Sequence, residues 1–274
     1  METNVIHCAH STNMSMVDDG SVTVIVTSPP YNVGKNYGCH NDLVNLNSYL
    51  KFLGKVWTEC KRVLRPGGRI CINIAGVNRK PYLPLHSHIA LQLVDLGFLR
   101  RGEIIWDKGA SVGTSTAWGS WRSPANPTLH DVHEYILVFS KDALGLKGNG
   151  RPSDITTGEF TEFTRSIWRF RTVSGKNVGH PAPFPEELPY RLIRLYSFAG
   201  DVVLDPFVGS GTTCVVVDRL NRRWIGIDID PQYVKLAKER IRQSRKVSPF
   251  VSSKKPKTGR PPSARRSLLP VAGY

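Results

Sequence analysis

Two loops in this sequence carry residue types and spacings suited to ligand binding or chemistry. The first, residues 205–213 (DPFVGSGTT), follows an apolar run and opens a helical pattern. Gly209 and Gly211 allow a tight turn and a close approach of the backbone to a ligand, and a helix N-terminus favours an anionic group. A phosphate-binding P-loop would need a Lys before the Ser or Thr, and a dinucleotide loop would need a third Gly. A purely structural turn remains the alternative.

An acidic residue follows this loop at the distance expected of a nucleotide site. Asp228 ends the next apolar run, and the spacing of about 20 residues matches that of ribose-binding acids. A carboxylate there can accept hydrogen bonds from the two hydroxyls of a ribose. The loop and the acid together favour a cofactor with an adenosine ribose and a small charged end, and S-adenosylmethionine has both.

The second loop, residues 27–32 (TSPPYN), follows a β-branched run. Pro29 and Pro30 fix the backbone and remove two N–H donors, so the carbonyl groups can face a ligand with fixed geometry. Tyr31 offers a flat ring on which a base could stack. Because X-Pro-Pro also punctuates ordinary loops, a structural turn is again the alternative.

Alternating strand and helix patterns must position these two loops. Apolar or β-branched runs predict strands, and apolar residues at helical spacing predict helices. We expect strands at 5–7, 22–26, 69–75, 102–106, 134–139, 201–205 and 224–228, and helices at 48–64, 87–96, 185–196, from about 210, and at 231–243. This alternation favours an α/β fold with a mostly parallel, doubly wound sheet, in which ligands bind beyond the carboxyl ends of the strands.

The charge of the chain is concentrated near its end. The net charge is +15, and the residues from 241 to 274 include nine Lys or Arg and no Asp or Glu. Such a charge indicates a polyanionic partner. We expect one catalytic domain over residues 1–245, with irregular insertions within 107–176, followed by a basic, disordered tail over 246–274.

Composition argues against several classes of protein. The five cysteines show no CxxC spacing, which disfavours a disulfide scaffold or a zinc site,. His86 and His88 have no neighbouring ligand cluster, so no metal is expected. The sequence shows no apolar run of ~18 residues and no signal-peptide pattern at its start, so we expect no membrane span and a cytoplasmic protein.

Five motifs follow one another along the chain: TSPPYN (27–32), RVLRPGG (62–68), HPAPFPEEL (180–188), DPFVGSGTT (205–213) and GIDIDPQYVKLAKERI (226–241). In this order they resemble the motifs of the S-adenosylmethionine-dependent, amino-group DNA methyltransferases. The sequence is most similar to the permuted, or beta, group, in which the catalytic segment precedes the cofactor segment. The resemblance covers residues 4–245 and is weakest across 107–175. It implies a Rossmann-like methyltransferase fold and methyl transfer to the exocyclic amine of a flipped base.

The resemblance also implies roles for individual residues. Ser28 and the carbonyl of Pro29 would accept hydrogen bonds from the target amine, and Tyr31 would stack on the flipped base. Family members often carry Gly-Asp at the end of the first strand, where this chain has Ala9-His10, so His10 is the candidate for the adenine contact. The other residues implied to hold the cofactor are Asp205, Phe207, Gly209, Ser210, Gly211, Thr212, Asp228, His180 and Phe184.

The target amine is predicted to be N4 of cytosine, with N6 of adenine as the alternative. Within the family, Ser before Pro-Pro-Tyr leans towards cytosine, and Asp or Asn leans towards adenine. Cytosine C5 chemistry is disfavoured because no Cys follows a Pro in this chain,. The rival interpretations are an RNA or protein methyltransferase and an inactive DNA-binding protein of the same fold. The order of the motifs argues against the first rival, because in glutamine-methylating relatives an N-P-P-Y segment follows the cofactor loop, whereas here TSPPYN precedes it.

Target reading is assigned to the two irregular stretches, 107–133 and 141–176. The candidate contacts with bases and phosphates are Trp118, Trp121, Arg122, Arg165, Trp168, Arg169 and Arg171,. Packing in the core is the alternative for the tryptophans. In the tail, Lys257 and Arg260 belong to a basic Gly-Arg-Pro segment that resembles an AT-hook, and a disordered tail that attracts DNA generally is the other interpretation. The expected partners are double-stranded DNA, a second copy of the chain in a homodimer, and a cognate restriction endonuclease, in a prokaryotic or viral setting.

Deleting residues 247–274 tests the role of the basic tail. We expect a lower affinity for DNA and a shallower salt dependence, because fewer phosphates are neutralised. Methyl transfer should be retained. Salt titrations of DNA binding and a labelled-methyl assay on both forms of the chain measure these effects. Complete loss of methyl transfer in the truncated chain would contradict this prediction.

Overall fold

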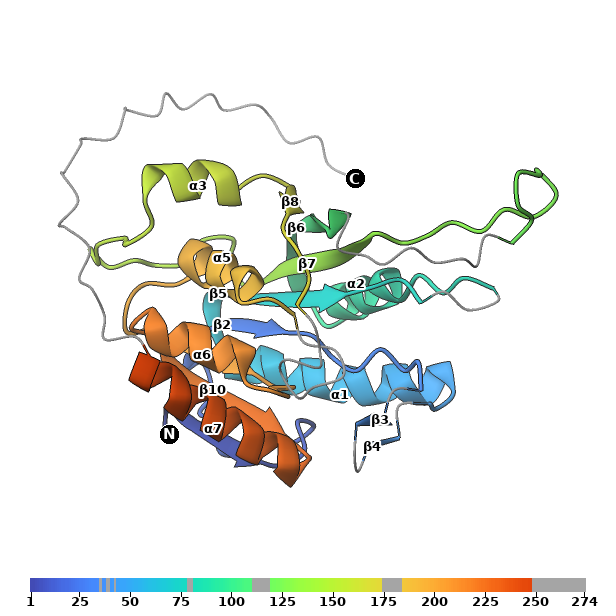
Figure 1. The fold of residues 1–274 in the computed structure, drawn as a ribbon. Helices are drawn as coiled ribbons and strands as arrows, with labels where there is room; N and C mark the ends of the chain where they lie inside the picture. Colours follow the sequence, from blue (N-terminus) through green and yellow to red (C-terminus); the bar gives the residue numbers. More distant parts are fainter. Residues whose placement is uncertain are drawn as a thin grey trace.

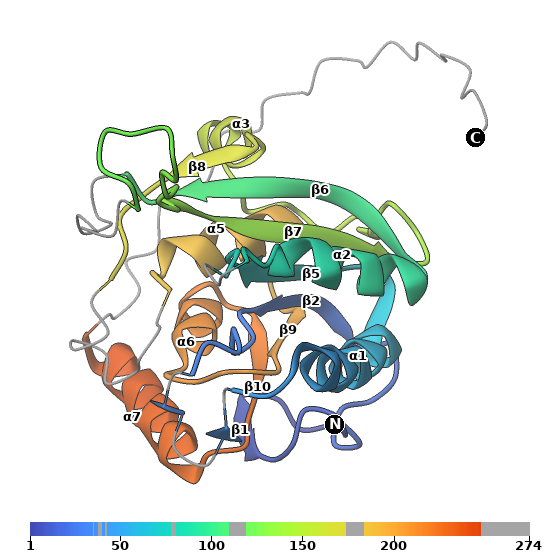
Figure 2. The same ribbon diagram turned by 90° about the vertical axis from the view of Figure 1, so that its right-hand side faces the viewer.

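The computed structural model describes residues 1–34, 36–37, 40–41, 43–77, 81–109, 119–173 and 184–247. Its centre is an eight-stranded sheet (Figure 1) in the order β1-β10-β9-β2-β5-β7-β6-β8, which can be followed by its labels in Figure 2. The strands of this sheet are β1 (Val5–Cys8), β2 (Val22–Thr27), β5 (Leu64–Ile74), β6 (Phe98–Asp107), β7 (His133–Lys141), β8 (Ile167–Arg169), β9 (Val202–Asp205) and β10 (Arg223–Asp228). A separate short ribbon pairs β3 (Asn36–Tyr37) with β4 (His40–Asn41).

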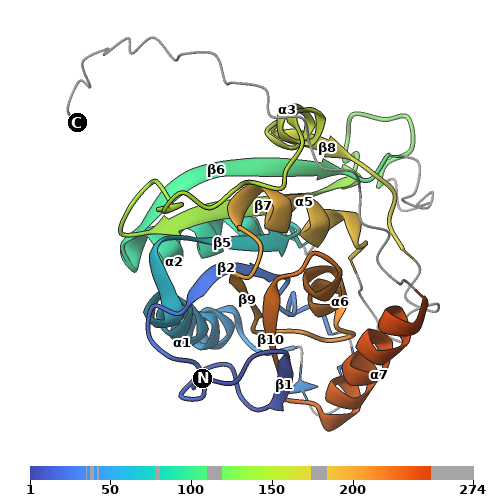
Figure 3. The ribbon, with the colours of Figure 1, turned by 90° about the vertical axis from the view of Figure 1, so that its left-hand side faces the viewer.

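Most of the sheet is parallel, and helices cover both of its faces. Strands β1, β10, β9, β2 and β5 run in one direction, and β7 is antiparallel to both of its neighbours. On one face lie α1 (Leu46–Val63) and α2 (Leu85–Asp95) (Figure 2), and on the other lie α5 (Glu187–Tyr196), α6 (Thr212–Arg219) and α7 (Pro231–Val247) (Figure 3). The predicted doubly wound α/β architecture is confirmed. No helix in the described ranges has the length and apolar character needed to cross a membrane.

Strand β2 shows how the sequence builds these layers. All of its residues are buried. Ile25 belongs to the core cluster that contains Trp57 of α1, whereas Val24 and Val26 belong to the cluster that contains Leu192 of α5. Successive side chains of a strand point to opposite faces, so a strand covered on both faces is buried at every position. The β-branched run at 22–26 therefore marks the middle of the sheet.

One expectation needs correction, because the stretch 141–176 is not irregular throughout. It contains α3 (Thr157–Phe163) and β8, the edge strand of the sheet, which pairs in parallel with β6. Thr156 caps α3 by accepting a hydrogen bond from the backbone of Glu159, whose side chain accepts from the backbone of Thr156 in return,. Both elements are too short to show a hydrophobic period, so the sequence pattern did not reveal them.

Arg191 of α5 anchors this added segment to the scaffold. Its side chain is 8% exposed, and it pairs with Glu187 and Glu162 at 2.8 and 2.9 Å. The guanidinium also lies over three aromatic rings, at 4.8, 5.4 and 5.3 Å from the centroids of Phe163, Trp168 and Phe170. A planar cation held between rings and carboxylates has a geometry that a Lys ammonium does not reproduce.

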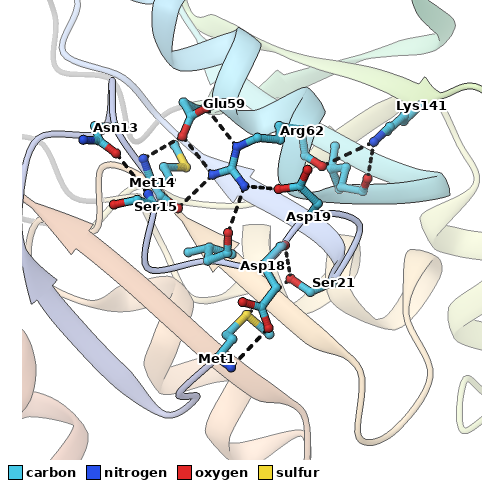
Figure 4. A network of polar contacts seen from close by, with 12 residues as sticks. Met1, Asn13, Met14, Ser15, Asp18, Asp19, Ser21, Glu59, Arg62 and Lys141 are labelled. Atoms are coloured by element: carbon cyan, nitrogen blue, oxygen red, sulfur yellow. Dashed lines mark hydrogen bonds and ion pairs between the residues drawn. The ribbon is translucent and has the colours of Figure 1, made fainter.

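Arg62 fastens the loop between β1 and β2 to helix α1 (Figure 4). It donates to the carbonyl oxygens of Met14 and Val17, at 2.8 and 3.0 Å, and it pairs with Glu59 and Asp19. Glu59 also accepts from the backbone N–H of Met14 at 2.7 Å. The hydrogen bond from Arg62 is the main reason why the pKa of Glu59 lies below its ordinary value. The Arg that opens the RVLRPGG motif thus has a structural role.

Replacing Arg191 with Lys tests the anchor on α5. The variant keeps the positive charge but loses the stacked plane, so we expect the free energy of unfolding to fall by about 1–2 kcal/mol. Urea denaturation followed by circular dichroism measures the change. Arg219→Lys is the matched control, because its pair with Glu186 is exposed and such pairs contribute about 0–1 kcal/mol. Equal losses in the two variants would contradict the proposed anchor.

Candidate active site

The two loops singled out in the sequence lie side by side where the parallel strands end, at the edge of the sheet formed by their carboxyl ends. Strands β2 and β9 are neighbours and parallel, so segments 28–31 and 206–211 leave the sheet together. The hydroxyl of Thr27 donates to Asp205 Oδ1 at 2.7 Å and joins the last residues of the two strands. Two loops separated by most of the chain therefore form one site.

Asp205 is the buried centre of this junction. Its carboxylate accepts hydrogen bonds from the hydroxyls of Thr27 and Thr213, both at 2.7 Å, and from the backbone N–H of Phe207 at 3.1 Å. The residue is 1% exposed. Burial raises the pKa of Asp205 to about 6, although the three hydrogen bonds favour the charged form,. Because both oxygens are used within the protein, Asp205 fixes the loop, and its direct contact with a cofactor stays a prediction.

Two glycines shape the loop and bring it against Asp228. Gly209 and Gly211 have φ angles of 47° and 82°, in the left-handed region that favours glycine,. A Cβ at Gly211 would lie 2.8 Å from the Cβ of Ala237 in α7. Gly209 donates its N–H to Asp228 Oδ2 at 2.9 Å. Burial raises the pKa of Asp228. The loop and the acid predicted to share a ligand are in direct contact.

Arg240 of α7 holds the next part of the loop, and sequence reasoning missed it. It donates to the carbonyl and hydroxyl oxygens of Ser210, at 2.6 and 2.8 Å, and to Thr212 Oγ1 at 3.3 Å. Ser210 and Thr212 are both 4% exposed, so their hydroxyls stabilise the loop, and their contact with a cofactor stays a prediction. Phe184, also predicted to line the cofactor, is half-buried against the core cluster beneath α5.

Aromatic rings line the loop on the side of α1. The ring of Phe207 packs edge-on against Phe52 and Trp57, with centroids 6.1 and 6.4 Å apart. His10 packs edge-on against Phe52 at 5.6 Å. His10 follows β1 almost directly, and the neighbouring strand β10 ends at Asp228. The candidate for the adenine contact therefore lies near the acid expected to hold the ribose.

Ser28 and Tyr31 belong to a polar cluster at the same edge of the sheet. Ser28 Oγ donates to Tyr31 Oη at 3.1 Å, and Tyr31 Oη donates to Glu134 Oε2 at 3.0 Å. Asn73 Nδ2 donates to Tyr31 Oη at 3.1 Å and also to Glu134 Oε2. Lys108 forms an ion pair with the other oxygen of Glu134. Hydrogen bonds with Ser28, Asn73 and Glu134 thus fix the hydroxyl of Tyr31, and with it the position of the ring in the loop.

Strand direction explains why these side chains meet. Asn73 lies near the carboxyl end of β5, and Lys108 directly follows β6. Glu134 lies at the start of β7, which is antiparallel to both strands and so begins where they end. The sequence patterns predicted the strands at 69–75 and 134–139 but not their relative direction, so they missed this cluster. The only indication of this cluster in the sequence was a polar residue within or at the end of each of these apolar runs.

The backbone of segment 28–32 is fixed by its neighbours. The carbonyl of Pro30 accepts from the hydroxyl of Tyr49 at 2.6 Å. The side-chain amide of Asn32, a buried residue with φ of 56°, exchanges two hydrogen bonds of 2.8 Å with the backbone of Val44. Because Tyr49 already uses the carbonyl of Pro30, the carbonyl of Pro29 is the better candidate to accept from a ligand.

The structure divides the predicted DNA contacts into exposed and buried residues. Trp121 is 67% exposed, and four arginines are also exposed: Arg122, Arg165, Arg169 and Arg171. Trp168 is 1% exposed and donates its indole N–H to the carbonyl of Phe163 at 3.2 Å, so of the two interpretations left open for it, packing in the core holds and DNA contact does not. Four predicted site residues lie outside the described residues: Trp118, His180, Lys257 and Arg260.

Comparison with known proteins identifies the family. A family model for N6 and N4 methyltransferases, described as DNA methylase, matches residues 22–239. The chain belongs to this family. The Type II methyltransferase M.HpaI of Haemophilus parainfluenzae is 34% identical over 82% of this chain and 69% of its own. The DNA adenine methyltransferase YhdJ of Escherichia coli K12 is 29% identical over 86% of this chain and 82% of its own.

Solved structures similar to this DNA methylase share its fold, and one of them identifies the cofactor. TTHA0409 of Thermus thermophilus, in complex with S-adenosyl-L-methionine, matches with a TM-score of 0.70 and 32% identity over 88% of this chain and 93% of its own. The cytosine-N4-specific PvuII DNA methyltransferase matches in fold, with a TM-score of 0.69 and 20% identity over 88% and 90% of the two chains. This methylase uses S-adenosylmethionine and acts on DNA. The chemistry of the site fits that cofactor, because a carboxylate, a glycine-shaped loop and flat rings meet there.

Asp205 makes the stability of the methylase depend on pH. Its pKa is raised to about 6 on folding, so its stabilising contribution is fully present below about pH 4 and is lost as the pH rises through about 6. Between about pH 4.5 and pH 7.5, the wild type should lose about 2 kcal/mol of unfolding free energy relative to Asp205→Asn, which does not titrate. Urea denaturation of both proteins across this range measures the difference. Parallel pH profiles would contradict the raised pKa.

Proposed function

We propose that this DNA methylase methylates the N4 amine of cytosine and that segment 28–31 (SPPY) is its catalytic segment. The supporting observation is that an alcohol, Ser28, lies at the end of β2, next to the bridge from Thr27 to Asp205 in the cofactor loop. The Ser28 hydroxyl donates to Tyr31, which leaves the lone pairs of Ser28 Oγ for the hydrogens of an amine,.

The reaction requires positioning more than a strong base. A base flipped out of the duplex would stack on the ring of Tyr31 and donate its amine hydrogens to Ser28 Oγ and the carbonyl of Pro29. These two hydrogen bonds would direct the nitrogen lone pair, otherwise delocalised into the ring, towards the methyl group. S-adenosylmethionine supplies that group as an electrophilic methyl on a sulfonium. The polar cluster around Tyr31 would keep the stacking ring in place.

We assign the cofactor to the loop between β9 and α6. The two oxygens of Asp228 accept the backbone N–H groups of Gly209 and Asp230, both at 2.9 Å. Each carboxylate oxygen can accept more than one hydrogen bond, so both can also bind a ribose hydroxyl. His10 would then contact the adenine, Phe207 would line the methionine half, and the glycine turn would let that half approach the backbone.

DNA would approach the edge of the sheet at which the two loops lie. The exposed Trp121 and the arginines of segments 119–122 and 165–171 would contact phosphates and base edges. Lys257 and Arg260 in the tail would add attraction to the phosphate backbone. M.HpaI is named a Type II methyltransferase, which supports a restriction–modification setting in a prokaryotic cytoplasm. A cognate endonuclease and a homodimer belong to this proposal.

Adenine N6 methylation is the second candidate function. YhdJ, named a DNA adenine methyltransferase, is 29% identical across most of both chains. Both target amines are exocyclic groups on planar rings, so either could donate to Ser28 Oγ and to the carbonyl of Pro29. An alcohol at position 28, rather than an acid or an amide, is the feature that favours cytosine.

Identification of the methylated nucleoside tests this choice. We expect DNA incubated with the enzyme and labelled S-adenosylmethionine to yield N4-methylcytosine after digestion to nucleosides and mass spectrometry. N6-methyladenine would support the second candidate instead. Ser28→Ala should lose most of the activity while it retains cofactor affinity, because the cofactor loop is unchanged. Label found in RNA or protein but not in DNA would overturn the function.

A further inference from the structure

We propose that Glu134 holds Ser28 as a hydrogen-bond acceptor and receives the proton that the target amine loses. The hydroxyl of Tyr31 forms the path between the two residues. This inference rests on the proposed catalytic role of Ser28. It extends that role by assigning a function to a carboxylate on a different strand, β7, at the same edge of the sheet.

The hydrogen directions in the cluster follow from the chemistry of its members. A carboxylate only accepts hydrogen bonds, and an amide NH2 group only donates them. Tyr31 Oη therefore accepts from Asn73 Nδ2 at 3.1 Å and donates to Glu134 Oε2 at 3.0 Å. Its remaining lone pair accepts the hydrogen of Ser28 at 3.1 Å. Rotating the Asn73 amide would place an oxygen against the carboxylate, so the arrangement has one favourable direction.

This direction matters because the nucleophile is an amine. A serine hydroxyl that rotates freely can donate its hydrogen to the amine lone pair and block its attack on the methyl carbon. With its hydrogen directed to Tyr31, Ser28 can only accept an N–H group from the amine. Through Tyr31, Glu134 thus orients the Ser28 hydroxyl as an acceptor before the substrate binds. Polar groups oriented in advance need no reorganisation during the reaction.

The same hydroxyls provide an exit for the proton. As the amine nitrogen bonds to the methyl carbon, the carbon–sulfur bond breaks and its electron pair stays on sulfur. The nitrogen then carries a positive charge and one extra hydrogen. That proton passes to Ser28 Oγ, while the Ser28 proton passes to Tyr31 Oη and the Tyr31 proton passes to Glu134 Oε2. The charges balance, because a sulfonium and a carboxylate become a neutral thioether and a neutral carboxylic acid.

The burial of the cluster supports a functional role. The side chains of Glu134 and Lys108 are 13% and 17% exposed and form an ion pair. Asn73 is 2% exposed, and its Oδ1 has no hydrogen-bond partner within the described part of the chain. Burying the charges of an ion pair costs solvation free energy, and a buried acceptor left unpaired costs free energy as well. An unpaired buried polar group in a native structure calls for an explanation, and a functional role supplies one.

Single-turnover methylation by Glu134→Gln, Tyr31→Phe and the double variant tests the proposal. Gln keeps the size of the side chain but is a poor proton acceptor, and Phe keeps the stacking ring but breaks the path. We expect each single variant of the full chain to be slower by about 100-fold, at the lower end of what acid–base catalysis contributes. The double variant should be no slower than the slower single variant, since both changes interrupt one path. Cofactor affinity, measured by calorimetry, should stay at the wild-type value.

A solvent isotope measurement separates proton acceptance from a merely structural role. We expect the wild-type rate to fall in D2O and the rate of Glu134→Gln to be insensitive to it. Glu103→Gln is the matched control, because Glu103 lies on the neighbouring strand β6 and pairs with Arg100 away from the cluster. This control should keep both the wild-type rate and the isotope effect.

Several outcomes would overturn the proposal. They are a wild-type rate in Glu134→Gln, losses that multiply in the double variant, and a wild-type rate that is the same in D2O. Tyr31→Phe leaves the ion pair of Glu134 with Lys108 intact, so it decides the matter even if Glu134→Gln does not fold. A fully active Ser28→Ala would overturn the assignment of the catalytic segment itself. An inactive Ser28→Ala variant together with a Glu134→Gln variant of normal rate would overturn only the proposed role of Glu134.

Discussion

The hydrogen bond from Thr27 to Asp205 joins the two halves of the site. It links the last residues of two parallel strands, and the loops that follow them carry the proposed catalytic segment and the turn proposed to bind the cofactor. Asp205 extends the link to Thr213 at the start of α6. Because the carboxylate is fully enclosed, a shift of either strand would leave a polar group without its partner, which costs free energy. The relative position of the two loops is therefore fixed by the core of the protein.

Charged side chains fix the surrounding segments in a similar way. Arg62 holds the loop after β1 on α1, Arg191 holds the α3–β8 segment on α5, and Arg240 holds the glycine turn on α7. Each guanidinium has several donors in a rigid plane, so one side chain can satisfy several backbone and carboxylate oxygens. Arg194 adds further ion pairs to the α3–β8 segment, with Glu159 and Asp154. The segment expected to approach DNA is thus carried on the scaffold by largely buried arginines of α5.

The sequence was sufficient for features that depend on local pattern. The run at 22–26, the turn around Gly209 and Gly211, and the acid Asp228 could all be found because strand period, glycine conformation and spacing act over a few residues. The roles of Glu134 and Arg240 could not be found, because they depend on which strands and helices become neighbours. Trp168 shows the same limit from the other side, since its type fits DNA contact and core packing equally well and only its burial decides.

The order of the strands along the chain also has a consequence for how the protein is made. Strand β2 pairs on one side with β5, which follows it closely in the chain, and on the other with β9, which is synthesised much later: Thr27 lies 178 residues before Asp205. Contacts of such long separation form slowly. Until then β2 presents an open, β-branched edge, and such edges favour association with other chains. A nascent chain that has left the ribosome up to α5 therefore already contains the proposed catalytic segment but not the loop proposed to bind the methyl donor.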